Sequence, residues 1–203
     1  MSKPSERLFN GADWDFQILQ RIHDACEDIA QSELGLNVYP NQIEVITAEQ
    51  MLDAYSSVGM PLFYKHWSFG KHFAFHEASY RKGLTGLAYE IVINSSPCIS
   101  YLMEGNTATM QALVIAHAAF GHNHFFKNNY LFRQWTDADG ILDYLDFAKS
   151  YVAQCEERHG RLAVEVTLDA AHALMSHGID RYPGKKNPDL RTEEKRAAQR
   201  RLH

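Results

Sequence analysis

Apolar residues recur at helical spacing along several long stretches of the chain. In residues 14–34 they fall every three or four positions, which predicts an amphipathic helix. Residues 107–120 (TATMQALVIAHAAF) are apolar almost all round, which predicts a helix buried in the middle of the domain. Residues 136–159 and 162–176 repeat the three- and four-residue spacing, so helices dominate the expected fold.

Two shorter stretches have the pattern of strands. Residues 42–46 (QIEVI) alternate apolar and polar positions, and residues 87–93 (LAYEIVI) are rich in β-branched and aromatic side chains. Ser96 followed by Pro97 is typical of a helix start. We therefore expect an α+β fold, mostly helical, with a small antiparallel sheet of about two strands packed on a helical layer.

Composition places the chain among ordinary globular proteins. Its 203 residues are 45% hydrophobic and 22% charged, and no apolar stretch reaches the roughly 20 residues that cross a bilayer. The first ten residues lack the apolar core of a signal peptide. Three cysteines lie far apart without a Cys-x-x-Cys pair, which favours reduced thiols. We expect a cytoplasmic protein with no membrane partner.

Charge is unevenly distributed and suggests where the domain ends. Residues 181–203 contain eight Lys or Arg and three acidic residues, a net charge of +5. The preceding 180 residues have a net charge of −10. We predict a globular domain over residues 1–180 and a basic linker or tail over 181–203. An acidic body repels nucleic acid, so nucleic-acid binding is not expected.

Histidines supply the first candidate chemistry. The chain has eleven, and His117 and His122 fall in and just after the most apolar helix. On a regular α-helix, five residues separate two side chains by roughly 140°, so these rings meet at one metal only if the helix breaks, for which Gly121 could take a left-handed conformation. The alternative is that His117 is a core histidine with ordinary hydrogen-bond partners.

A second polar cluster lies on the last predicted helix. Glu165, Asp169 and His172 share one stripe of that helix. The stripe is either its solvent-facing side or a set of ligands that faces the first two histidines. In the second case Asp169 or Glu165, with the histidines, would form a mixed site for zinc, iron or manganese.

Two further carboxylates are candidates for the general base. Glu90 interrupts an apolar strand, and Glu104 lies before the next helix. A carboxylate in a sheet is either at an edge facing water or held by a partner. Near a metal, Glu90 could be a ligand or a general base, and Glu104 is the second candidate base.

Long motifs resemble one known family. They are YPNQIEVITAEQMLDAYSSVGMP, HWSFGK, YRKGLTGLAYEIVINSSPCISYLME, TMQALVIAHAAFGHNHFFKNNYLF, WTDADGILDYLDFA and LDAAHALMSHGIDRY. The chain resembles the N-terminal region of the SpoVR family, named for stage V sporulation protein R. The resemblance implies a cytoplasmic bacterial protein tied to spore cortex formation, or to a stress response with a serine kinase.

Two functions remain open at this point. The first is a metal-dependent hydrolase-like domain, with His117, His122, His172 and Asp169 as ligands and a water molecule activated by the metal. Its substrate class, cell-wall precursors or peptide amides, is implied by the resemblance alone. The second is a non-catalytic regulatory module that works with a serine kinase, in which the histidines only pack.

Overall fold

The computed structural model describes residues 7–57, 64–86, 89–177 and 199. The chain divides into two units, Met1–Arg158 and His159–His203, and each is described by itself. The predicted boundary between a domain and a basic tail at residue 181 lies outside the described residues and stays a prediction.

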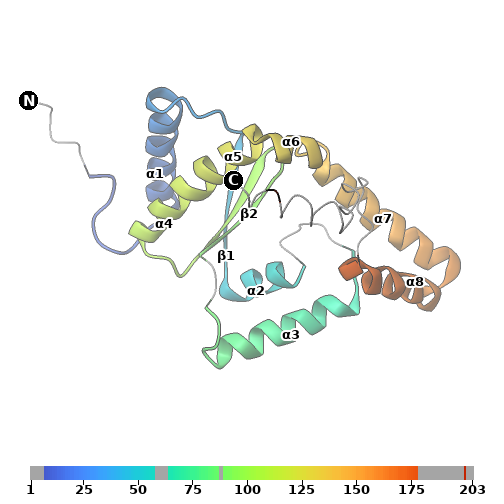
Figure 1. Ribbon diagram of the computed structural model, residues 1–203. Helices are drawn as coiled ribbons and strands as arrows, with labels where there is room; N and C mark the ends of the chain where they lie inside the picture. Colours follow the sequence, from blue (N-terminus) through green and yellow to red (C-terminus); the bar gives the residue numbers. More distant parts are fainter. Residues whose placement is uncertain (1–6, 58–63, 87–88, 178–198, 200–203) are drawn as a thin grey trace, which may run out of the picture. The chain divides into compact units, whose positions relative to one another are not determined.

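A small mixed sheet forms the middle of the first unit. Its strands are β1 (Asn41–Ile46), β2 (Glu90–Ile93) and β3 (Cys98–Met103), in the order β1-β3-β2 (Figure 1). β3 pairs parallel to β1 and antiparallel to β2. The mostly helical α+β class is confirmed.

The prediction of about two antiparallel strands missed the central strand of the sheet. Residues after Ser96–Pro97 form the central strand β3 rather than a helix. Cys98–Met103 (CISYLM) can take either structure by local preference, and its pairing with strands on both sides decides for the strand. The sheet therefore has three strands, and one of its two pairs is parallel.

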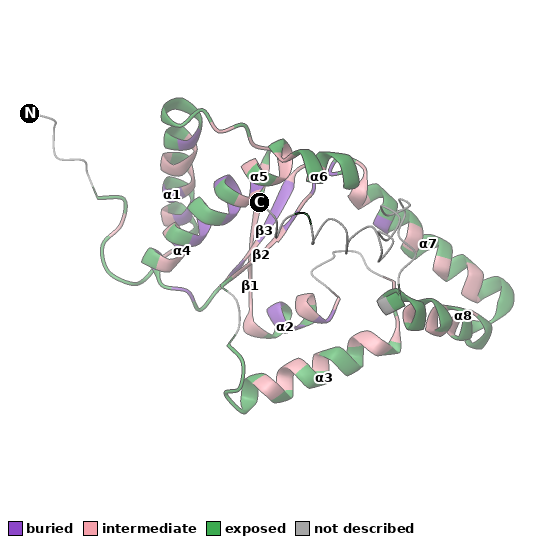
Figure 2. Cartoon of the chain, in the orientation of Figure 1, coloured by how far each residue is buried: buried purple, intermediate pink, exposed green. Residues whose placement is uncertain are grey.

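Two helical segments pack on the sheet and form the core. The first is α1 (Phe16–Asp28), which continues as the π-helical η1 (Ile29–Glu33). The second is α4 (Ala108–Ile115), which continues as the π-helical η2 (Ala116–His122). Figure 2 shows buried positions on these helices and on the strands. The core cluster consists of Leu19, Ile22, Ala30, Leu102, Val114, Ile115, Ala119 and Phe120.

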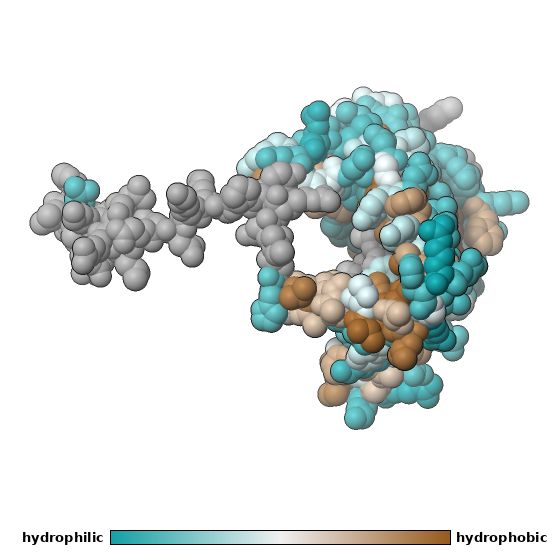
Figure 3. Space-filling model, turned by 90° about the vertical axis from the view of Figure 1, so that its right-hand side faces the viewer, coloured by the Kyte–Doolittle hydropathy of each residue, from teal (hydrophilic) through white to brown (hydrophobic). Residues whose placement is uncertain are grey.

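The helix 107–120 is less buried than its composition predicts. Leu113 is 64% exposed, and His117 is also exposed. Only one side of the helix meets the sheet, so an all-apolar sequence leaves apolar residues at the surface. Figure 3 shows apolar residues beside hydrophilic ones on the surface of the molecule.

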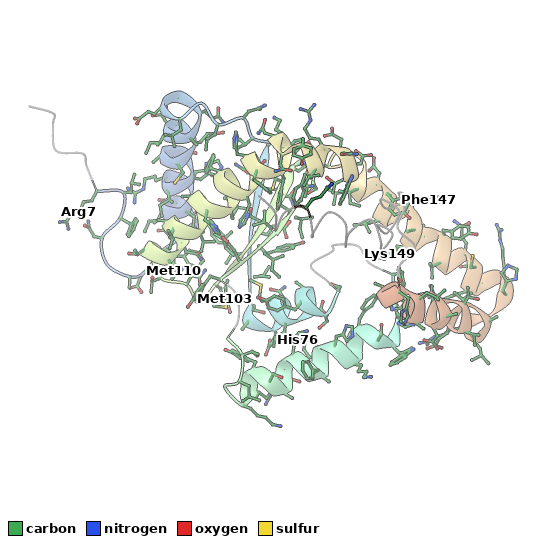
Figure 4. All side chains as sticks on the ribbon, viewed as in Figure 1. Arg7, His76, Met103, Met110, Phe147 and Lys149 are labelled. Atoms are coloured by element: carbon green, nitrogen blue, oxygen red, sulfur yellow. The ribbon has the colours of Figure 1, made fainter. Side chains whose placement is uncertain are left out.

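Two more helices follow β1. Thr47 caps α2 (Ala48–Ser56) with a capping box, in which the Thr47 hydroxyl accepts from the Gln50 N–H. α3 (Trp67–Arg81) packs against α2, and the His76 ring lies 6.0 Å from the Tyr55 ring (Figure 4). The His76 ring is therefore part of the packing between α2 and α3.

The chain then runs through α5 (Asn123–Asn128), α6 (Tyr130–Trp135) and α7 (Ile141–His159). The helix predicted from Thr136 begins at Ile141 instead, because the Thr136 hydroxyl donates to the Phe132 carbonyl at the end of α6. The second unit contains α8 (Arg161–Leu174) and the short 3₁₀ helix η3 (Met175–His177). No helix of the described residues is both long enough and apolar enough to span a bilayer.

Candidate metal centre

Strand β2 directs Glu90 toward the helices. Glu90 pairs with Leu102 across the antiparallel ladder, so both side chains project from the same face of the sheet. Leu102 is fully buried in the core with residues of α4 and η2. Glu90 therefore points toward η2 from the outer strand, and its side chain is only 16% exposed.

The π-helical turn brings the two histidines together. η2 contains both His117 and His122, and i→i+5 hydrogen bonding places residues five apart on one side of the helix. Their rings lie 4.3 Å apart, measured between centroids. The predicted convergence is present, but the predicted left-handed break is wrong, because Gly121 belongs to the continuous helix and lacks a positive φ.

Glu90 joins both histidines. Its Oε1 accepts a hydrogen bond from Nδ1 of His117 at 2.5 Å and lies 3.8 Å from Nε2 of His122. One ligand atom from each residue lies within 4.8 Å of the others. Donors to one tetrahedral ion at about 2.0–2.1 Å sit roughly 3–3.5 Å apart, so small side-chain rotations would place all three around a common ion.

Burial in the group is graded. The His117 side chain is 59% exposed and that of His122 is 41% exposed, whereas Glu90 lies beneath them. The alternative prediction of a buried core histidine at His117 does not fit this exposure. The arrangement presents two imidazoles to solvent over a less exposed carboxylate.

Two buried amides hold the helix over the sheet at either end. Gln111, on α4, donates to the Met103 carbonyl at 3.1 Å. Asn123, just after η2, donates to the Tyr39 carbonyl and to Oδ1 of Asn41, and accepts from the Tyr39 N–H. Both amide side chains are fully buried, so they fix the rotation of the helix that carries the histidines.

Sequence reasoning missed these positioning residues because their partners are distant in the chain. It also missed Phe126, whose ring stacks on His122 at 5.9 Å and restricts the orientation of the imidazole. His124 follows His122 by two residues in the sequence. Its ring instead hydrogen-bonds Asn37 and Asn128, outside the group.

The remaining predicted residues lie elsewhere. Glu104 is exposed in the turn after β3, where it lines a shallow cavity with Trp14, and it is outside the Glu90 group. Asp169 and His172 lie three residues apart on α8 and are both partly buried in the second unit. The roles of Glu104 as a base and of Asp169 and His172 as ligands stay predictions.

A second set of possible ligands, which the sequence analysis did not consider, lies on α1. His23, Asp24 and Glu27 offer atoms within 4.8 Å of one another. Asp24 and Glu27 already accept hydrogen bonds from Gln20 and Gln31 on the same helix. The i, i+1, i+4 spacing of these residues could have indicated this set. However, both carboxylates already accept a hydrogen bond from a glutamine side chain of the same helical segment.

The surroundings of Glu90 also fit a bound cation. Its Oε2 is buried and has no hydrogen-bond partner among the described residues. An uncompensated buried carboxylate oxygen is costly, and a cation bound beside the two imidazoles would remove that cost. The donor set of two imidazoles and a carboxylate suits zinc, iron or manganese.

Comparison with known proteins identifies the family. Residues 13–203 match the family described as "SpoVR like protein". The chain is 58% identical over 200 residues to the "Uncharacterized protein YcgB" of Escherichia coli (strain K12). The match covers 98% of this chain and 39% of YcgB, so the chain spans about two fifths of that relative's length. No solved structure matches. The matched range includes nearly the whole chain, which therefore belongs to the SpoVR family.

Proposed function

We propose that Glu90, His117 and His122 bind a divalent metal ion. The observation that carries the proposal is the convergence of three donors from two separate elements, with the buried Glu90 Oε2 lacking any other partner among the described residues. A π turn is rare in proteins and is frequent at functional sites. The turn here has a specific consequence, since it aligns two histidines that a regular helix would separate.

The donor set favours a catalytic ion over a structural one. Structural zinc sites are closed by four protein ligands, whereas catalytic sites keep an open position. Two histidines with one carboxylate are also the facial set of non-haem iron(II) proteins. The exposure of both imidazoles is consistent with an open position on the solvent side.

The reaction that we propose is hydrolysis. A bound divalent ion would supply a Lewis acid that lowers the pKa of water. Glu90 would hold the ion and fix the His117 ring through its short contact with Nδ1. This assigns Glu90 as a ligand rather than a distant base, and leaves Glu104 as the proposed base. Amide bonds of cell-wall precursors or peptides are the substrate class that the family resemblance suggests.

A non-catalytic function is the second candidate. The hydrogen bond between His117 and Glu90 already pairs the two side chains without an ion. In this case the domain would be a regulatory module that works with a serine kinase. A role in spore cortex formation or in a stress response is a proposal from the family resemblance under either candidate.

Metal analysis of the purified chain tests the first proposal. We expect about one equivalent of zinc, iron or manganese after dialysis against the ion and gel filtration, and less than a tenth of that in His117→Ala and His122→Ala. His124→Ala is the matched control, because His124 lies in the same segment but outside the group. Sub-stoichiometric metal that His117→Ala leaves unchanged would favour the regulatory module.

Hydrolysis is tested separately. The loaded chain should cleave a peptidoglycan-derived muropeptide or a peptide amide, and His122→Ala should abolish the cleavage. Bound metal without turnover of either substrate would retain the ion and remove the hydrolase assignment.

A further inference from the structure

Strand β1 is an outer strand of the sheet. It pairs with β3, and no other described segment pairs with it. The carbonyls of Pro40 and Ile46 accept from β3 and from the residue that follows it, so the backbone groups of even-numbered residues face inward. The N–H and C=O groups of Asn41, Ile43 and Val45 therefore point away from the sheet.

A groove runs beside this open edge, between β1 and α1. It has a volume of about 330 Å³. Figure 1 shows both elements in the same part of the first unit. On the strand, the side chains that line the groove belong to the same residues whose backbone groups face outward. The lining residues are Phe16, Leu19, Gln20, His23, Asn41, Ile43 and Val45.

The chemistry of the groove specifies an uncharged, partly apolar occupant. Its walls hold four apolar side chains, and the polar ones carry no formal charge when His23 is neutral. The Phe16 side chain is 76% exposed, although apolar residues of the groove lie beside it. An apolar group bound in the groove would cover this ring. The occupant should therefore present apolar side chains toward the groove.

The backbone of the edge specifies an extended peptide. Proteins usually protect an open edge with charged side chains, proline or a bulge. β1 (NQIEVI) contains no proline, and its register against β3 is continuous without a bulge. Its one charged residue, Glu44, projects from the face opposite the groove. A six-residue edge whose outward donors and acceptors pair with no described segment, next to a side-chain groove, has the form of sites that bind a peptide by adding a strand.

We propose that β1 and this groove bind an extended strand from the part of SpoVR-family proteins that lies outside the region matched here. YcgB has about three fifths of its length in that part, so in that relative such a strand would be covalently linked to the matched region. The strand would pair with the outward groups of Asn41, Ile43 and Val45 and place alternate apolar side chains against Phe16. This docking is independent of the metal proposal.

Overlapping 12-residue peptides that cover the unmatched part of YcgB test the proposal against the 203-residue chain. We expect one peptide with alternating apolar residues to bind, and to slow hydrogen exchange of the three outward amides by at least about tenfold. Val45→Pro removes one outward donor without touching the ladder to β3, so it should abolish that protection. Gln42→Ala, on the same strand but outside the groove, keeps all three outward donors and is the control.

Several outcomes would overturn the proposal. They are the absence of any peptide that protects these amides, protection that survives Val45→Pro, and binding that protects another segment only. Protection that appears without peptide and rises with protein concentration would assign the edge to a second copy of the chain. If Val45→Pro does not fold, exchange of the wild-type amides alone decides the other cases.

Discussion

At the scale of single residues, the two carboxylate oxygens of Glu90 have different surroundings. It is a carboxylate on an outer strand that faces a helix, and one of its oxygens contacts two imidazoles while the other has no partner among the described residues. Sequence pattern alone could identify Glu90 as unusual, because it interrupts an apolar strand. It could not identify the partners, since His117 lies 27 residues away.

Glu90→Gln tests the charge of this residue with little change of shape. We predict a loss of metal affinity of at least about tenfold, because an amide is a poorer ligand than a carboxylate. Isothermal titration with zinc and manganese measures the change. Glu44→Gln, on the outer strand β1, is the control, and equal losses in both variants would contradict a specific role for Glu90.

Cys98 gives a prediction about pH. Burial raises the pKa of its thiol from 9.0 to about 11, against a smaller opposite effect of the Ser95 backbone. The folded chain therefore holds this proton more tightly than the unfolded chain does. Its contribution to stability is complete below pH 9 and is lost as the pH rises toward 11.

Urea unfolding between pH 8 and 11 checks this prediction. The wild type should lose stability more steeply over that range than Cys98→Ala, in which the thiol is absent. Parallel curves for the two proteins would show that Cys98 titrates alike in the folded and unfolded states.

At the scale of elements, local signals predicted much of the fold. Residues 42–46 and the capping box at Thr47 were recognisable because neighbouring residues determine them. β3 was not, since pairing on both sides decides its structure. The π turn was also inaccessible, because sequence periodicity assumes 3.6 residues per turn and the extra residue is accommodated only when the helix packs.

Gly121→Ala separates the observed helix from the predicted left-handed break. A Cβ at this position would meet only ordinary contacts, at 3.7 Å from the Ala116 carbonyl oxygen and 4.0 Å from the His117 ring. Alanine should therefore stabilise the chain by about 0.5–1 kcal/mol, because it loses less backbone entropy than glycine.

Urea unfolding measures this change in the free energy of unfolding. A left-handed glycine would give the opposite sign, a loss of about 1–2 kcal/mol. Metal affinity should be unchanged in Gly121→Ala, since the alanine side chain would not reach Glu90.

At the scale of the whole molecule, the residues predicted as ligands are divided between the two units. The Glu90 group belongs to the first unit, and Asp169 and His172 belong to the second. The stripe on α8 was predictable from helical spacing within one element. Whether this stripe binds a metal depends on contacts between distant parts of the chain. The spacing of residues within one helix carries no information about such contacts.

His172→Ala tests the prediction that α8 contributes a ligand. If α8 contributes a ligand, as the sequence pattern predicted, metal affinity should fall by about 10- to 100-fold, whereas the site proposed from Glu90, His117 and His122 predicts no change. His177→Ala, an exposed histidine of the same unit, is the control. An unchanged affinity in His172→Ala would confine the site to Glu90, His117 and His122.

The π turn also affects how related sequences should be searched. One wider turn is equivalent to an α-helix that has accepted a single inserted residue, so the pair separated by Ala-Ala-Phe-Gly behaves as if it had the familiar His-x-x-x-His spacing. A scan restricted to that familiar spacing passes over this segment. Shortening the segment by removing Gly121 should restore a regular helix and keep both imidazoles on one side, which would turn a hidden motif into a recognisable one.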